Sequence, residues 1–241
     1  MIELLGVGVQ DEQKAWRLRK ACARFHPGTL SAVVAGAPAD GAAVLDALSG
    51  RRIPEEGRVW VTRVPLMRET RGRIRALVGE ATATAVFVTH RSVLWNTRVT
   101  RDTVIARLLR LSHRGQEQAA LSALAAVGLA RRGGDPLVAL PPGDRLRVAV
   151  ARTLVRRPAA LVLRDVDAAL GPDDAASLLG MLGRLVRSHR LIAVVSLASV
   201  ELARTHADRV LVVAAGALVA DTPGARPPAA PAARQLQGVV R

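Results

Sequence analysis

Residues 143–157 alternate between apolar and basic side chains with the spacing of a helix. Leu146, Val150 and Leu154 recur at near-helical intervals, and the segment also carries five arginines, at positions 145, 147, 152, 156 and 157. Proline residues interrupt the chain on both sides of this run, the second of them being Pro158. The pattern predicts an amphipathic helix that ends before Pro158.

The run at residues 160–163 is apolar on both faces, which is typical of a strand buried in the middle of a parallel sheet. The chain turns polar directly afterwards, at Arg164 and Asp165. Comparable apolar runs occupy residues 191–197 and 209–214, and helical patterns separate the three runs. This alternation predicts an α/β fold with a mostly parallel sheet.

The remaining patterns place further elements along the chain. We expect a strand that leads into Gly36, a helix over residues 41–48, and helices over residues 103–112 and 116–126. An antiparallel β edge region is expected near the N-terminus, beginning with a strand at Met1. Gly171 and Pro172, followed by two acids, open another helix.

These elements predict one domain over residues 1–221. Residues 1–89 and 143–221 form its α/β core, and residues 90–142 form a helical subdomain. A chain of 241 residues with 50% hydrophobic content can bury one such core. The segment 222–241, which is rich in Pro and Ala, predicts a C-terminal tail.

Two stretches of the sequence resemble a known protein family residue by residue. Residues 146–154 read LRVAVARTL before Arg157 and Pro158, and residues 194–204 read VVSLASVELAR before ADRV. Together they resemble the ATP-binding subunits of ATP-binding-cassette (ABC) transporters, over nearly the whole chain, and the second stretch is most similar to phosphonate-importer ATPases. The resemblance implies an ABC-type P-loop NTPase fold. It also implies a dimer in which ATP lies between one subunit's phosphate loop and the other subunit's signature loop.

The resemblance places the phosphate loop at residues 36–43. Such a loop needs a Lys for the β- and γ-phosphates and a hydroxyl for Mg²⁺, but Ala42 and Ala43 stand at these positions, and Asp40 adds a negative charge. A hydrogen bond to a charged group contributes roughly 1.5–3 kcal/mol, so losing two weakens nucleotide binding by about two to four powers of ten. The vestigial nucleotide site comprises Gly36, Ala37, Pro38, Ala39, Asp40, Gly41, Ala42, Ala43 and, at the position of the Mg²⁺-sensing glutamine, His90.

The acids expected at the end of strand 160–163 are also changed. The resemblance places Arg164 at the Mg²⁺-supporting Asp and Asp165 at the catalytic Glu. If the alignment shifts by one residue, Asp165 becomes the metal-site acid and Val166 stands at the base position. One role is unfilled under both alignments. Asp165 is the candidate catalytic residue, and an ordinary polar strand end is the alternative interpretation.

The positions that would complete a dimeric site have changed too. The signature loop maps onto Leu140, Pro141, Pro142, Gly143 and Asp144. Two prolines therefore replace the Ser and Gly that would hold the γ-phosphate. The switch histidine maps to Ala198, and the aspartate after the acid pair maps to Gly171. Both halves of the composite site are altered together.

Net charge is the one unusual property of the composition. The chain carries 35 Lys and Arg against 20 Asp and Glu, for a formal charge of +15. This charge favours anionic lipid, nucleic acid or an acidic partner, but no aromatic stacking pattern accompanies a basic stretch, so no specific nucleic-acid motif is present. The histidines show no metal-ligand spacing. No apolar run reaches the roughly 18 residues of a membrane span, and no leader precedes the first strand, so we expect a cytoplasmic chain that reaches the membrane's inner face through a partner.

Three hypotheses follow. The first is a degenerate ABC subunit, or pseudo-ATPase, that acts as a structural or regulatory partner of a membrane permease or of another ABC subunit in a dimer. The second is a divergent but active ABC ATPase that drives import of a small solute such as a phosphonate. The third is an ABC domain repurposed to bind an anionic surface or nucleic acid. Loss in both halves of the composite site favours the first, with ATP and Mg²⁺ bound weakly or not at all and no other cofactor expected.

Overall fold

The fold is built around a single sheet. In this sheet an N-terminal strand, Trp16–Phe25, lies beside a C-terminal strand, Ala217–Pro223. The computed structural model describes residues 1–85, 87–98 and 113–224. Within them, ten strands form the order β5-β4-β1-β2-β10-β9-β3-β8-β7-β6. The strands are β1 (Ile2–Gln10), β2 (Trp16–Phe25), β3 (Thr29–Ala35), β4 (Glu56–Val61), β5 (Val64–Pro65), β6 (Val78–Ala81), β7 (Ala160–Leu163), β8 (Ile192–Leu197), β9 (Arg209–Ala214) and β10 (Ala217–Pro223).

Parallel and antiparallel pairing divide this sheet into two parts. Strands β9, β3, β8, β7 and β6 pair in parallel and form the centre of the fold. Strands β1, β2, β4 and β5 pair antiparallel and form one edge region. Strand β10 runs antiparallel to β9 and joins the edge region through the pair Ala217–Arg19. The fold is therefore α/β, with the predicted antiparallel edge region.

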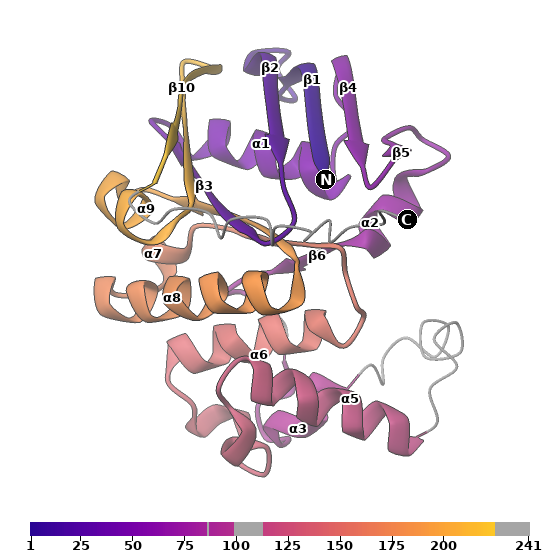
Figure 1. Cartoon of the computed structure of the whole chain (residues 1–241), viewed down its shortest axis with the longest axis vertical. Helices are drawn as coiled ribbons and strands as arrows, with labels where there is room; N and C mark the ends of the chain where they lie inside the picture. Colours follow the sequence, from indigo (N-terminus) through magenta and orange to yellow (C-terminus); the bar gives the residue numbers. More distant parts are fainter. Residues whose placement is uncertain (86, 99–112, 225–241) are drawn as a thin grey trace, which may run out of the picture.

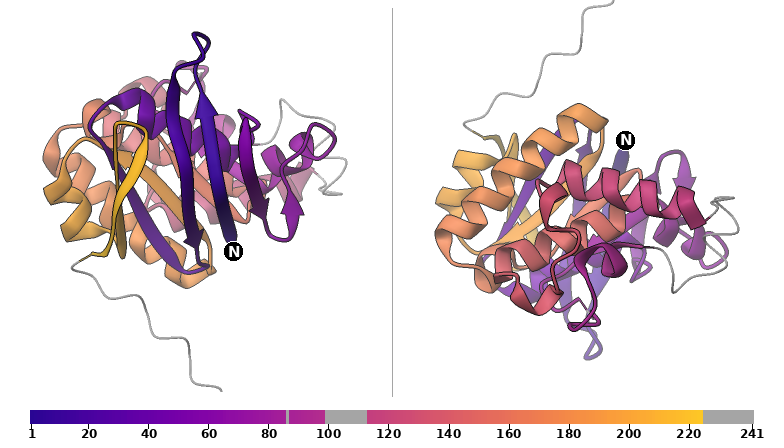
Figure 2. Two further views of the ribbon diagram at one scale, coloured as in Figure 1. Left: turned by 90° about the horizontal axis from the view of Figure 1, so that it is seen from above. Right: turned by 90° about the horizontal axis from the view of Figure 1, so that it is seen from below.

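Helices cover both faces of the parallel strands (Figure 1). The described helices are α1 (Pro38–Ser49), α2 (Arg71–Leu77), α3 (Val93–Thr97), α5 (His113–Ala126), α6 (Pro142–Leu154), α7 (Val166–Ala169), α8 (Pro172–His189) and α9 (Val200–His206). Helix α1 lies between the antiparallel strands and one face of the parallel strands, whereas α6 and α8 lie on the opposite face. Helices α3 and α5 pack against α6, on the side away from the sheet, as Figure 2 also shows.

Strand β7 shows how the two hydrophobic cores arise from one sequence pattern. Leu161 and Leu163 pack in the core beneath α6 and α8, while Ala160 and Val162 pack in the core around α1. Successive side chains of a strand point to opposite faces, so a strand covered on both sides must be apolar at every position. The continuous apolar run in the sequence thus has its physical explanation.

Most predicted elements are confirmed, and the differences lie at their ends. Strands at 160–163 and 209–214 have the predicted bounds, and strand 191–197 begins one residue later. Helix 116–126 begins earlier, at His113. The predicted helix 103–112 lies outside the described residues, as does the part of the predicted tail beyond residue 224.

Two boundaries differ in ways that matter for the chain's organisation. Helix α1 begins at Pro38 rather than at residue 41. Pro fits the first turn of a helix because its φ is already helical and its missing N–H is not needed there. Strand β10 also runs into the predicted tail, because Thr222 pairs with Val210 and Pro223 with Arg209 on β9.

Candidate functional site

The predicted phosphate loop is for the most part helical. Only Gly36 and Ala37 separate β3 from α1, and the helix then runs through the other six residues, 38–43. The Gly36 N–H donates to the Val213 carbonyl at 3.1 Å, and the Asp40 N–H donates to the Ala37 carbonyl at 3.0 Å. Pro38 has no N–H. Three of the eight positions of the predicted phosphate loop, Gly36, Pro38 and Asp40, therefore have no free backbone donor.

Asp40 points its carboxylate into the protein. The residue is 5% exposed, and its Oδ2 accepts from the Gly216 N–H at 3.3 Å. This contact joins the start of α1 to the turn between β9 and β10. Ala42 and Ala43 follow on α1, where the resemblance places Lys and Ser or Thr, and Ala43 is buried.

Arg164 lies at the end of β7 and binds two acids from other elements. Its Nη2 lies 2.6 Å from Asp46 Oδ1 on α1 and 3.2 Å from Glu80 Oε1 on β6. Arg51 contacts the second oxygen of Glu80, with 2.6 Å between its Nε and Oε2. The Arg164 side chain is only 16% exposed. A guanidinium in place of the expected metal-supporting acid is thus neutralised by the protein itself.

The cluster also changes the acidity of Glu80. Burial alone raises the pKa of Glu80, but the neighbouring Ser49 hydroxyl and the positive charges of Arg164 and Arg51 lower the pKa by more than burial raises it, so the net pKa lies below the usual value for a glutamate. Glu80 therefore stays ionised and paired at neutral pH. Asp46 and Glu80 were not predicted from the sequence.

Asp165, the candidate catalytic residue, is exposed and bonded to β8. Its backbone is left-handed, with φ 46° and ψ 49°, a conformation that Asp tolerates better than most residues. The Asp165 N–H donates to Ser196 Oγ at 2.7 Å, and the Ser196 hydroxyl donates to Asp165 Oδ1 at 3.0 Å. This two-way contact fixes the end of β7 against β8 and uses one of the two carboxylate oxygens.

Asp167 contributes a contact that the sequence did not predict. Its carboxylate accepts from the Ala198 N–H at 2.9 Å and from the Ser199 N–H at 2.7 Å. Ser199 is the N-cap of α9, so the acid stabilises the positive end of that helix. Ala198 is the position of the switch histidine by resemblance, and the segment around it is therefore held by a carboxylate from α7.

The signature-loop positions lead into α6. Leu140 is buried, Pro141 is the N-cap residue, and no side chain caps the helix. Asp144 binds Arg132 at 3.0 Å between Oδ2 and Nη1. Pro142 and Gly143 form the first turn, and a Cβ built on Gly143 would lie 3.2 Å from Asp174 Cγ. With prolines at its start, α6 presents few backbone donors.

The two remaining predicted positions lie in exposed connections. His90 occupies a turn well beyond the end of β6 at Ala81, and Gly171 is the N-cap residue of α8. Across the described residues, no group of three or more His, Cys, Asp or Glu side chains is placed to hold a metal ion. The charged groups that do converge here bind one another or backbone N–H groups.

Comparison with known proteins gives several import ATP-binding proteins as sequence relatives. No protein-family model matches the chain. The chain is 32% identical over 205 residues to the phosphonates import ATP-binding protein PhnC 1 of Natronomonas pharaonis, covering 82% of this chain and 83% of that protein. It is 30% identical over 181 residues to the protein of the same name from Cupriavidus metallidurans, covering 74% of this chain but only 61% of the relative's length. A methionine import ATP-binding protein of Cutibacterium acnes is 30% identical over 80% of this chain and 52% of its own length.

Solved structures agree on the fold. The cbiO1 protein of Clostridium perfringens, part of an ABC transporter complex, superimposes with a TM-score of 0.82 at 17% identity, over 92% of this chain and 88% of its own. A dimeric ATP-binding cassette in a post-hydrolysis state with bound ADP and Pi superimposes with a TM-score of 0.74 at 18% identity, over 92% and 98% of the two chains. No helix within the described residues is long and apolar enough to cross a membrane.

Proposed function

The chain belongs to the family of ATP-binding subunits of ABC transporters, and we propose that within this family it is a pseudo-ATPase. In this proposal it serves as a structural or regulatory partner of a membrane permease or of a second ABC subunit. Its fold is retained because the partner needs the shape, and its nucleotide chemistry is lost.

The observation that carries the proposal is the pairing of Arg164 with Asp46 and Glu80. A site for Mg²⁺ and a triphosphate needs free carboxylate oxygens for the metal and free donors for the phosphates. Here the strand-end position is a cation, and the nearby acids already bind it at 2.6 and 3.2 Å. An incoming Mg²⁺ would have to compete with a covalently attached guanidinium for the same oxygens.

The phosphate side of the site supports the same proposal. Helix α1 begins at Pro38, and the N–H groups of Gly36 and Asp40 already donate to carbonyls. The buried carboxylate of Asp40 adds repulsion toward a triphosphate. Without a Lys at residue 42, no side chain of the loop offers a compensating positive charge.

Pairing with an intact subunit would not restore a complete site in this proposal. The resemblance implies that each ATP needs a phosphate loop from one subunit and a signature loop from the other. Pro141 and Pro142 stand where the second subunit's nucleotide would be held. The relatives named for phosphonate and methionine import suggest an importer permease as the partner, at the cytoplasmic face of a membrane.

The test is steady-state phosphate release by the purified chain with Mg-ATP. The Natronomonas pharaonis relative serves as positive control, and an Asp165→Asn variant reports on contaminating ATPases. We expect the same background rate for the wild-type chain, for Asp165→Asn and for buffer. Turnover by the wild-type chain that disappears in Asp165→Asn would favour the alternative, a divergent but active ATPase.

A further inference from the structure

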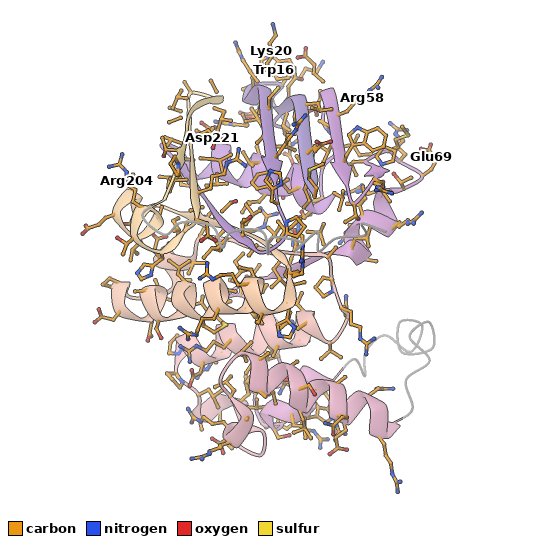
Figure 3. All side chains as sticks on the ribbon, viewed as in Figure 1. Trp16, Lys20, Arg58, Glu69, Arg204 and Asp221 are labelled. Carbon is orange, nitrogen blue, oxygen red and sulfur yellow. The ribbon has the colours of Figure 1, made fainter. Side chains whose placement is uncertain are left out.

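One edge of the molecule carries a concentration of exposed arginines. Between residues 58 and 75 the sequence has six Arg and one acid, Glu69. These residues belong to β4, β5, α2 and their connections, which lie together at one side of the molecule in Figure 1 and in the left view of Figure 2. Figure 3 labels Arg58 and Glu69 on this side. We call five of these arginines, all of them exposed, the basic edge: Arg58, Arg63, Arg68, Arg73 and Arg75.

The sixth arginine has a structural role that the others lack. Arg71 Nε donates to the Gly50 carbonyl at 2.8 Å, and its Nη2 donates to the Arg51 carbonyl, so it fastens α2 to the end of α1. The five residues of the basic edge make no ion pair or side-chain hydrogen bond within the parts of the chain that the structure describes. Their charge is directed to solvent and is available to a partner.

A second arginine-rich run provides the contrast. Residues 145–157 contain five arginines and no acid, but the protein itself uses several of them. Arg145 donates to the Leu140 carbonyl at 2.8 Å, Arg147 donates to Ser177 Oγ at 2.7 Å, and Arg152 lies 4.6 Å from the centre of the Phe87 ring. High arginine content alone therefore does not produce an unpaired surface, and the basic edge differs in this respect.

An exposed apolar side chain lies among these cations. Met67 is 51% exposed, on the connection between β5 and α2 and directly before Arg68. Thr70 fixes this connection, because its Oγ1 accepts from the Met67 N–H at 2.9 Å and its hydroxyl donates to the Pro65 carbonyl at 2.5 Å. A fixed loop thus presents one exposed apolar side chain directly before Arg68 of the basic edge, and an apolar side chain beside cations suits the interface of an anionic bilayer.

We propose that the basic edge docks this chain directly on a membrane that contains anionic lipids, without help from a permease. A nucleic acid fits the surface less well. Half-buried Trp60 is the one aromatic residue between positions 58 and 75, and α2 has only seven residues, too few to read a groove. The proposal goes beyond the pseudo-ATPase function and does not depend on it, because no nucleotide takes part.

The experiment measures co-sedimentation of the full chain with vesicles. One set contains phosphatidylcholine alone, and the other contains equal parts of phosphatidylcholine and phosphatidylglycerol. We expect binding to the second set only, and release at about 1 M salt, where the Debye length is about 3 Å. Each basic residue near an anionic surface strengthens binding about fivefold. Replacing Arg63, Arg68, Arg73 and Arg75 together by Gln should therefore weaken it by at least about a hundredfold.

A matched variant tests whether binding depends on the basic edge or only on the net charge of the chain. It replaces four exposed cations elsewhere, Lys20, Arg131, Arg184 and Arg204, by Gln and so removes the same total charge. We expect it to bind within a few-fold of wild type, and a common thermal unfolding midpoint will show that all variants fold. Equal loss in the two variants, or no binding of the wild-type chain to the anionic vesicles, would overturn the proposal.

A variant at Met67 distinguishes docking on a bilayer from binding to other anionic surfaces. Met67→Ser keeps every charge but removes the apolar contact, and we expect it to weaken vesicle binding by about tenfold. Unchanged binding by Met67→Ser, or complete displacement of the chain from vesicles by duplex DNA, would contradict docking on a bilayer.

Discussion

Replacing Arg164 by Met tests how the protein stabilises its altered site. The substitution keeps most of the side chain's volume but removes the cation between Asp46 and Glu80. Two carboxylates that were paired then lie close together, and Arg51 remains to balance only Glu80. We expect a large loss of stability without a change of fold.

The magnitude follows from the burial of the three groups. Removing one partner of a fully buried ion pair costs about 3–5 kcal/mol, because the other charge is left uncompensated. Arg164 is 16% exposed and Glu80 is 19% exposed, but Asp46 is 31% exposed and partly hydrated. The expected cost therefore lies below that range, at about 2–3 kcal/mol.

Urea denaturation at pH 7 measures this cost, and a surface pair provides the control. Arg24 lies 3.0 Å from Glu3 with its side chain 65% exposed, so Arg24→Met should cost less than about 1 kcal/mol. A double variant with Asp46→Asn should lose less than the sum of the two single variants, with a coupling of about 1–2 kcal/mol. If Arg164→Met costs no more than Arg24→Met, the cluster does not stabilise this site and the reasoning fails.

Three further predictions address neighbouring contacts. Asp167→Ala removes the acceptor of two backbone N–H groups at the start of α9 and should lower the unfolding free energy by about 2 kcal/mol. The control variant Asp173→Ala, in the first turn of α8, should lower it by about 0.5 kcal/mol, and equal costs would contradict the role of Asp167. Gly79→Ala places a Cβ 2.0 Å from Thr153 Cγ2 and should cost about 1–3 kcal/mol, and Thr153→Ser in the same chain should recover part of that loss in denaturation experiments. The pKa of Glu80 is lower in the folded than in the unfolded protein, so ionised Glu80 stabilises the fold above its unfolded-state pKa, and this stabilisation is lost as the pH falls through its folded-state pKa. The difference in unfolding free energy between wild type and Arg164→Met should therefore shrink in acid. A difference that stays constant with pH would exclude Glu80 as the partner of Arg164.

The sequence predicted the fold well because burial leaves a local pattern. The apolar run at residues 160–163 identifies a strand covered on both faces, whatever the identity of the covering helices. The start of α1 was missed because the glycine spacing of a phosphate loop suggested an open turn. Pro38 and Asp40 favour a helical first turn at the same place, and in this chain the local preference prevails.

The site's partners could not be predicted from the sequence, for a physical reason. Because Arg164 follows an apolar strand, the sequence indicates that its positive charge needs an acidic partner. Its two partners lie 118 and 84 residues away in the sequence. No periodicity relates residues at such separations, and only the packing of α1 and β6 beside β7 brings them together. Asp167 was missed because its partners are backbone N–H groups, which the identity of a residue does not reveal.

Calorimetric titration of the purified chain with Mg-ATP tests the central claim most directly. The claim is that the groups that would bind Mg-ATP at this site are missing or are already paired with other groups of the protein. It predicts no saturable heat up to millimolar Mg-ATP, while the Natronomonas pharaonis relative, titrated in parallel, binds. Micromolar Mg-ATP binding by the wild-type chain, with phosphate release that continues at a steady rate, would contradict it.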